Sequence, residues 1–102
     1  MKFLYVSNVS KAKQYAGILK KVAGQTEGVA QLGWEAHYTC VDGSSVLLCS
    51  ADGSKLQRKD FPSGLRWHEQ QQSIARCISE FAADGCYDAV YIKGFLANPY
   101  AL

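Results

Sequence analysis

Three residues stand where a ligand could be held: Asn8, Gly17 and Lys93. Asn8 closely follows a short apolar run, Gly17 lies at the start of a helical pattern, and Lys93 directly follows another apolar run. Backbone N–H groups at a helix start attract phosphate, and a glycine lets a ligand approach the backbone closely. A lysine at a strand end can hold an anionic or polyhydroxylated substrate. These positions predict binding of a polar ligand, whereas no residue of the chain is assigned a catalytic role.

Structural roles for the same residues remain open. Gly17 could serve close packing of a helix on a strand, and Lys93 could be a solvated surface lysine. The chain contains neither G-x-G-x-x-G nor G-x-x-x-x-G-K-[ST], so it predicts no dinucleotide site and no P-loop. His37 and His68 have no Ser, Cys or carboxylate at the spacing of a catalytic triad. We interpret both histidines as structural or surface residues.

The cysteines and the net charge exclude further classes of protein. Cys40, Cys49, Cys77 and Cys86 form no C-x-x-C pair and have no histidine at metal-ligand spacing. We therefore predict reduced structural thiols, no metal and no cofactor, with a disulfide framework as the less favoured alternative. Eleven Lys and Arg against nine Asp and Glu leave a net charge of +2. That charge is too small to indicate a nucleic-acid or anionic-membrane partner, whose binding surface is a dense basic patch.

Hydrophobic periodicity predicts helices that alternate with strands. Apolar runs predict strands, helical spacing predicts two helices, and Asp52-Gly53 predicts a hairpin turn between a buried run and a polar one. The expected elements are strands at 3–6, 34–41, 46–49, 55–59 and 88–92 and helices at about 16–32 and 65–83. Gly33 and Gly85 are placed to end the two helices.

This order predicts an α/β fold, a Rossmann-like three-layer sandwich with a mostly parallel sheet and the first strand in its middle. The polar second arm of the hairpin places the hairpin at an edge of the sheet or off it, as an insertion. Ligands gather beyond the carboxyl ends of such parallel strands, here near Asn8, Asp42 and Lys93. No apolar run reaches the roughly 20 residues that span a bilayer, and the first apolar run is too short for a secretory signal. We therefore expect a cytoplasmic protein.

Four segments, in their order and spacing, resemble the N-terminal domain of glycosyltransferase family 4-like enzymes, which have the two-domain GT-B fold. The four segments are KFLYVS at 2–7, GILKKV at 17–22, LGWEA at 32–36 and YDAVYIK at 87–93. The third resembles the family's L-x-G-H-E-V signature with Trp34 in place of the histidine. The fourth resembles its Y-D-x-[IV]-[YH]-x-[RH] strand with Lys93 in the last position.

The resemblance implies that residues 1–102 are the acceptor-side, N-terminal half of a longer enzyme. The full-length enzyme would be a hexosyltransferase that moves a sugar from a nucleotide-sugar donor to a glycan or lipid-linked acceptor, as in polysaccharide or cell-surface glycan synthesis. The donor would be bound mainly by a second domain, so the isolated fragment is expected to be inactive. The resemblance places acceptor or phosphate binding at Asn8, Gly17 and Lys93. It is also compatible with peripheral association at the inner face of the membrane.

A non-catalytic flavodoxin-like or receiver-like module for binding or regulation is the alternative. A receiver needs clustered acidic residues after its first strand, where this chain has Ser7 and Asn8. A flavin site needs a Ser/Thr/Gly-rich phosphate loop, and residues 11–15 are KAKQY. These differences favour the transferase hypothesis.

Overall fold

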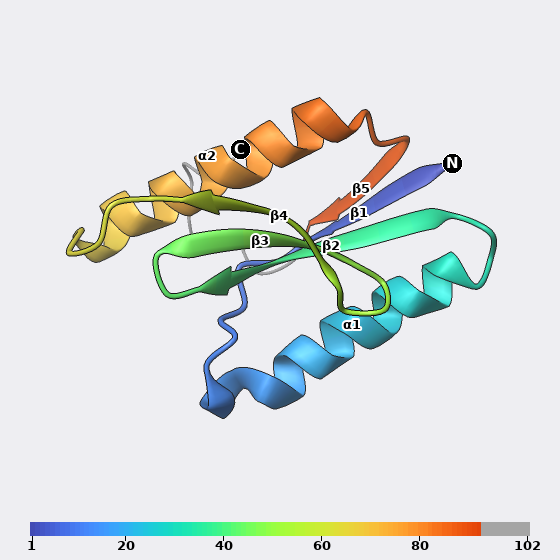
Figure 1. Cartoon of the computed structure of the whole chain (residues 1–102), viewed down its shortest axis with the longest axis horizontal. Coiled ribbons are helices and arrows are strands. Elements are labelled where there is room, and N and C mark those ends of the chain that lie inside the picture. Colours follow the sequence, from blue (N-terminus) through green and yellow to red (C-terminus); the bar gives the residue numbers. More distant parts are fainter. Residues whose placement is uncertain (93–102) are drawn as a thin grey trace.

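The computed structural model describes residues 1–92, which form a five-stranded sheet with one long helix on each face (Figure 1). Strands and helices follow the order expected from the hydrophobic pattern. Their bounds are β1 Lys2–Val6, the short 3-10 helix η1 Lys13–Tyr15, α1 Ala16–Ala30, β2 Glu35–Asp42, β3 Ser45–Ser50, β4 Lys55–Asp60, α2 Trp67–Gly85 and β5 Ala89–Ile92.

The strand order across the sheet is β4-β3-β2-β1-β5. β1 pairs in parallel with β2 on one side and with β5 on the other, so it is an interior strand, but β2 and not β1 occupies the predicted middle position. Leu4 and Tyr5 of β1 are buried on opposite faces. An apolar run without alternation suits a strand that is covered on both faces.

The prediction of a mostly parallel, Rossmann-like sheet with an inserted hairpin is wrong. β3 pairs antiparallel with β2, β4 pairs antiparallel with β3, and these antiparallel ladders are longer than the parallel ones. β2 and β3 are antiparallel because only two residues connect Asp42 to Ser45. A parallel neighbour would need a crossover of a dozen or more residues. Gly43 provides the positive φ of +60° that such a tight turn requires. The hairpin is therefore an integral part of a mixed sheet.

The two arms of the hairpin differ in burial, which fixes their places in the sheet. The side chains of residues 46–49 in β3 are all buried, so β3 lies inside the sheet. β4 is polar and almost wholly exposed, and it forms the outer edge. Charged side chains on an edge strand hinder pairing with other chains.

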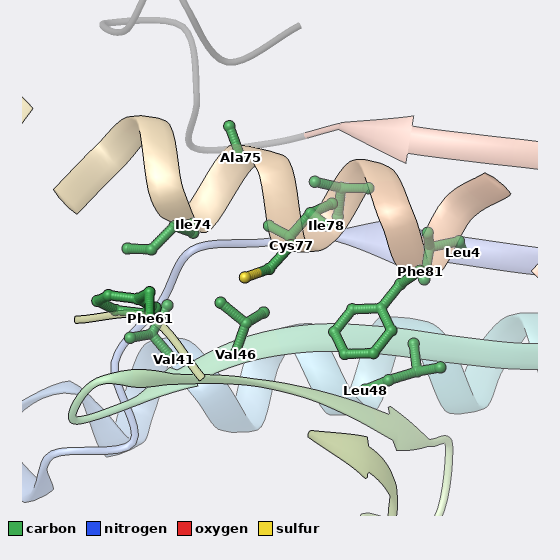
Figure 2. Close-up of a cluster of buried hydrophobic side chains, with 11 residues drawn as sticks. Leu4, Val41, Val46, Leu48, Phe61, Ile74, Ala75, Cys77, Ile78 and Phe81 are labelled. Carbon is green, nitrogen blue, oxygen red and sulfur yellow. The ribbon is translucent and has the colours of Figure 1, made fainter. Parts of the chain in front are cut away.

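α2 packs on one face of the sheet and forms the larger part of the core (Figure 2). Its buried residues recur every three or four positions, as predicted for an amphipathic helix. They contact β1 and β3 and the chain after β4. The buried residues of this cluster are Leu4, Val6, Val41, Val46, Leu48, Phe61, Ile74, Ala75, Cys77, Ile78 and Phe81.

α1 packs on the opposite face through a narrower stripe (Figure 1). Its only buried residues are Val22 and Thr26. The Thr26 hydroxyl donates to the Val22 carbonyl at 2.8 Å, which satisfies a polar group that is fully buried. The sheet side of this second core consists of Tyr5, Val9, Tyr38, Cys40, Leu47 and Cys49.

All four cysteines are free thiols in this structure, and three of them are buried. Cys40 and Cys49 belong to the strands and lie in the core beneath α1, and Cys77 belongs to α2 and lies in the core between α2 and the sheet. Their positions agree with the interpretation of cysteine as a small buried hydrophobe. Within residues 1–92, neither helix combines the length and the apolar composition needed to cross a membrane.

Candidate ligand-binding site

The carboxyl ends of β2, β1 and β5 lie along one edge of the sheet because all three strands run in the same direction. β2 extends past the end of β1, and the loop that follows β1 runs alongside this extension of β2. Thr39 of β2 holds this segment with two hydrogen bonds. Its Oγ1 accepts from the Ser7 backbone N–H at 2.9 Å, and its hydroxyl donates to the Ser7 carbonyl at 2.8 Å. Thr39 is fully buried, so the start of the loop is fixed from within the core.

The loop is anchored again two and four residues later. The Val41 backbone N–H donates to the Val9 carbonyl at 2.8 Å, and the Lys11 N–H donates to the Val41 carbonyl at 2.7 Å. Residues 7–11 therefore hold a defined path along β2 without belonging to a regular strand. A loop that is pinned to a rigid sheet can present its side chains in fixed positions.

A pocket of about 440 Å³ lies between this loop and the start of α1. Its polar groups come from the loop, and its apolar surface comes from β1, η1 and the first turn of α1. The residues that line it are Tyr5, Ser7, Asn8, Val9, Ser10, Tyr15 and Ile18. An apolar concavity with a few placed polar groups is typical of small-ligand sites.

The serines and the amide of this pocket keep unused hydrogen-bonding capacity. Ser7 Oγ accepts from the Val9 N–H at 3.1 Å, and Ser10 Oγ accepts from the Ala12 N–H at 3.0 Å. Within residues 1–92 neither hydroxyl proton has an acceptor, although Ser7 is only 6% exposed. Asn8 Nδ2 donates to Gln71 Oε1 of α2 at 3.3 Å, which leaves its Oδ1 without a donor in the same residues. The pocket can therefore donate to and accept from a polar ligand.

The three residues predicted to bind a ligand have different positions relative to the pocket. Asn8 lies in the pocket. Gly17 is next to the pocket residue Ile18 but does not line the pocket. Apart from its chain neighbours and the backbone of its own helix, no atom of residues 1–92 would lie within 4 Å of a Cβ at Gly17, so close packing does not explain this glycine. Lys93 lies outside the described residues.

Several pocket residues were not predicted from the sequence. Ile18 lies in the segment 16–32 whose apolar spacing predicts a helix packed on the sheet, but it is 56% exposed and lines the pocket with Tyr15. Periodicity could not show this, because the first turn of α1 lies beside the loop after β1 and not over the sheet. Ser7 and Ser10 each accept a hydrogen bond from the backbone N–H two residues later, as serines in turns often do. The two serines are the local sequence signal that could have indicated an ordered loop here.

The amino ends of the same parallel strands carry a different set of polar groups. His37 Nδ1 lies 2.6 Å from the Tyr87 hydroxyl, and His37 Nε2 lies 3.5 Å from Glu35 Oε2. Lys2 donates from Nζ to the Gly85 carbonyl at 2.6 Å and lies 3.6 Å from Glu35. These groups use one another as partners and tie the end of α2 to the sheet.

Burial is the main electrostatic influence at these amino ends. It lowers the pKa of His37, although the nearby Glu35 carboxylate acts in the opposite direction. Burial followed by the charge of Glu35 raises the pKa of Tyr87 to about 12. The imidazole is therefore neutral at physiological pH, and its Nδ1 accepts from the Tyr87 hydroxyl in the tautomer that carries the proton on Nε2. This arrangement supports the interpretation of His37 as a satisfied structural histidine.

A metal centre has no support in the part of the chain that the structure describes, where no three His, Cys, Asp or Glu side chains gather closely enough to hold an ion. Comparison of the chain with family models, curated proteins and solved structures gave no match.

Proposed function

We propose that this chain forms the acceptor-binding wall of a glycosyltransferase, with the pocket at the carboxyl end of β1 as the acceptor site. The observation that carries the proposal is the position of this pocket. It lies at the edge where three adjacent parallel strands end, and that edge is where open α/β sheets bind their ligands. The four sequence segments that resemble family 4-like glycosyltransferases support the choice of a sugar as ligand.

The side chains of the pocket suit a sugar. The Ser7 and Ser10 hydroxyls can donate and the Asn8 carbonyl oxygen can accept, as a polyhydroxylated ring requires. Tyr15 and Ile18 add apolar surface for the C–H face of the ring. The rigid loop would hold the acceptor in one orientation, and a fixed orientation is a large part of what an enzyme contributes to a two-substrate reaction.

In the transfer itself, the bond from the anomeric carbon to the nucleoside diphosphate breaks, and a bond from that carbon to the acceptor oxygen forms. The acceptor hydroxyl gives up its proton, which leaves with the nucleoside diphosphate or passes to solvent. The proposal assigns the donor to a second domain, so this chain contributes binding and orientation of the acceptor. The chain alone is then expected to bind simple sugars and to show no transferase activity.

Saturation-transfer NMR with the methyl glycosides of glucose, galactose, mannose and N-acetylglucosamine tests this proposal on the chain of residues 1–102. We expect at least one glycoside to bind and the N8A variant to bind it about fivefold to tenfold more weakly, the loss of one hydrogen bond. The matched control is Q57A, which removes an exposed amide from β4 at the far edge of the sheet.

Two results would contradict the proposal. One is unchanged glycoside binding by N8A. The other is calorimetry that shows tight binding of uridine-diphosphate glucose to this chain, because the donor would then belong to this domain. FMN is included in the same titrations, and FMN binding at this loop would support the flavodoxin-like alternative.

A further inference from the structure

β4 is the outermost strand on its side of the sheet, so only one side of its backbone pairs with β3 (Figure 1). The N–H of Phe61, directly after β4, donates to the Ser44 carbonyl at 2.8 Å, so Phe61 faces β3. Backbone groups alternate in direction along a strand, so Lys59 also faces β3, whereas Arg58 and Asp60 face away from the sheet. Within residues 1–92 no strand pairs with these outward N–H and C=O groups, which form a template for one more strand.

A concavity of about 560 Å³ lies beside this free edge, on the face of the sheet that α2 covers. The residues that line it include Lys59, Phe61, Pro62, Arg76, Cys77 and Glu80. A second concavity of about 450 Å³ shares Pro62 and Arg76 with the first and continues along α2 towards its start. We name the two concavities together the α2 groove. An extended peptide paired with β4 would place every second side chain on the face that carries this groove.

The free edge and the α2 groove carry cations that the chain does not neutralise. The ion pairs of this region are Arg58–Asp60, Lys59–Glu80 and Arg66–Glu69. Lys55 of β4 and Arg76 of α2 have no carboxylate within 4 Å in residues 1–92. Arg76 is exposed, and its hydrogen bond to Ser73 Oγ is long at 3.4 Å. The guanidinium of Arg76 is therefore available to an external carboxylate.

A second copy of the chain fits this edge poorly. Antiparallel pairing of two β4 strands must join outward-facing residues, so Arg58 would lie opposite Arg58, Arg58 opposite Asp60, or Asp60 opposite Asp60. The first and third registers place like charges directly opposite each other, and the second places Lys59 opposite Lys59. Like charges in these positions destabilise a sheet. A different strand, with carboxylates among its side chains, would meet attraction at the cations.

We propose that the free edge of β4 and the α2 groove bind an extended acidic segment of a partner protein, which joins the sheet as a sixth strand. Strand addition is a recurring mode of peptide recognition, in which backbone hydrogen bonds give affinity and alternate side chains give specificity. Arg58 and Asp60 each offer an N–H and a C=O to the added strand. This backbone template favours a peptide over a nucleic acid, which has no amide backbone to pair with it.

This inference goes beyond the proposed transfer reaction, because the α2 groove shares no residue with the ligand pocket. NMR titration of the labelled 102-residue chain with the peptide acetyl-ETEVETE-amide provides the test, and acetyl-KTKVKTK-amide is the matched control peptide. With the acidic peptide we expect amide shifts at Arg58, Asp60 and Arg76, and weaker binding at high salt. The signals of Ser7 and Asn8 should stay in place, and the basic peptide should not bind.

R58P tests the backbone pairing. Proline at this position removes an N–H that faces away from β3, and edge strands tolerate proline in that orientation. R58A removes the same charge and keeps the N–H, so it is the matched control. We expect R58P to bind the acidic peptide about tenfold more weakly than R58A does, because a backbone hydrogen bond is lost.

R76Q tests the α2 groove. Loss of the guanidinium should weaken binding of the acidic peptide about twofold to fivefold, as expected for an ion pair at an exposed site. The control K21Q removes one positive charge from α1, on the opposite face of the sheet, and should leave binding unchanged. Circular dichroism of each variant verifies that it is folded.

Several results would overturn the proposal. They are the absence of shifts at β4 with the acidic peptide, equal binding of the two peptides, equal binding by R58P and R58A, and equal binding by R76Q and K21Q. Sedimentation that shows a dimer of the wild type and a monomer of R58P would assign the edge to a second copy instead. Glycoside binding is unaffected by any of these results, so this proposal and the proposed function fail separately.

Discussion

The two ends of the parallel strands of one sheet carry polar side chains of different kinds. At the amino ends, Lys2, Glu35, His37 and Tyr87 are close partners of one another or of the backbone. At the carboxyl ends, Ser7, Asn8 and Ser10 line a pocket, and each keeps a hydrogen-bonding group without a partner within residues 1–92. Residue types alone favour the amino end as a site, since it holds the histidine, the carboxylate and the tyrosine. The carboxyl end is the better candidate for a ligand site, because its polar groups keep hydrogen-bonding capacity that residues 1–92 do not use.

This contrast predicts that substitutions at the amino ends change stability and that substitutions at the carboxyl ends change ligand binding. The following predictions test that division.

The largest effect on stability is expected at Gly85, the last residue of α2. A methyl group there would overlap the ring of Tyr87, which is held by its hydrogen bond to His37. We expect G85A to lower the free energy of unfolding by roughly 1–2 kcal/mol, because overpacking outweighs the better helix propensity of alanine. Urea denaturation measures this, and the melting temperature should fall by roughly 5–10 °C.

The same substitution at Gly28 provides the control for Gly85. Gly28 lies in α1 with no atom within 4 Å of an added methyl group. G28A should therefore stabilise the chain by up to about 1 kcal/mol through helix propensity alone. Equal effects of the two substitutions would contradict the packing that we describe for Tyr87.

Substitution of Cys86 by glycine should stabilise the folded chain. It follows α2 with φ of +51°, in the left-handed region that costs a residue with a Cβ about 1–2 kcal/mol. We expect C86G to raise the free energy of unfolding by about 1 kcal/mol in the same urea experiment. C86A keeps the Cβ and should give no such gain, and a gain as large as that of C86G would show that loss of the thiol is the cause.

His37 should make stability depend on pH. Burial lowers its pKa in the folded chain below that of the unfolded chain, so the unfolded chain binds the proton more readily. Stability should be full above about pH 6.5 and decrease as the pH falls below that value. Urea unfolding over this pH range measures the slope. H37Q should reduce the slope, and an unchanged slope in H37Q would contradict the role given to His37.

Asn8 should show the smallest effect on stability. Within residues 1–92 its one side-chain hydrogen bond, to Gln71, is long at 3.3 Å. We expect N8A to change the free energy of unfolding by less than about 0.5 kcal/mol while it weakens sugar binding. A loss of stability comparable to that of G85A would show that Asn8 is structural and would remove it from the site.

The sequence predicts the fold in part, and the residues show why. The uninterrupted apolar run of β1 correctly indicates a strand between two parallel neighbours, because both of its faces are covered. The prediction of a mostly parallel sheet is wrong beyond β2, where β3 and β4 pair antiparallel. The reason is that Gly43 and Ser44 form a tight turn whose signal is two residues long, and β3 was therefore not recognised as an antiparallel neighbour of β2.

The site was predicted less completely than the fold. Asn8 follows a strand closely, so its position at the carboxyl edge could be inferred from chain order. Tyr15 and Ile18 reach the pocket only because Thr39 and Val41 pin the loop along β2, and those tertiary contacts leave no periodic signal. Lys93 lies outside the described residues, so its predicted role stays a prediction.

Backbone amide NMR mapping tests the central claim most directly, since it reports on both ends of the sheet in one spectrum. Titration of the labelled chain with a bound methyl glycoside should shift the amide signals of Ser7, Asn8, Ser10 and Ile18. The signals of Glu35, His37 and Tyr87 should stay in place. Shifts confined to these three residues at the amino ends would contradict the assignment of the site to the carboxyl ends.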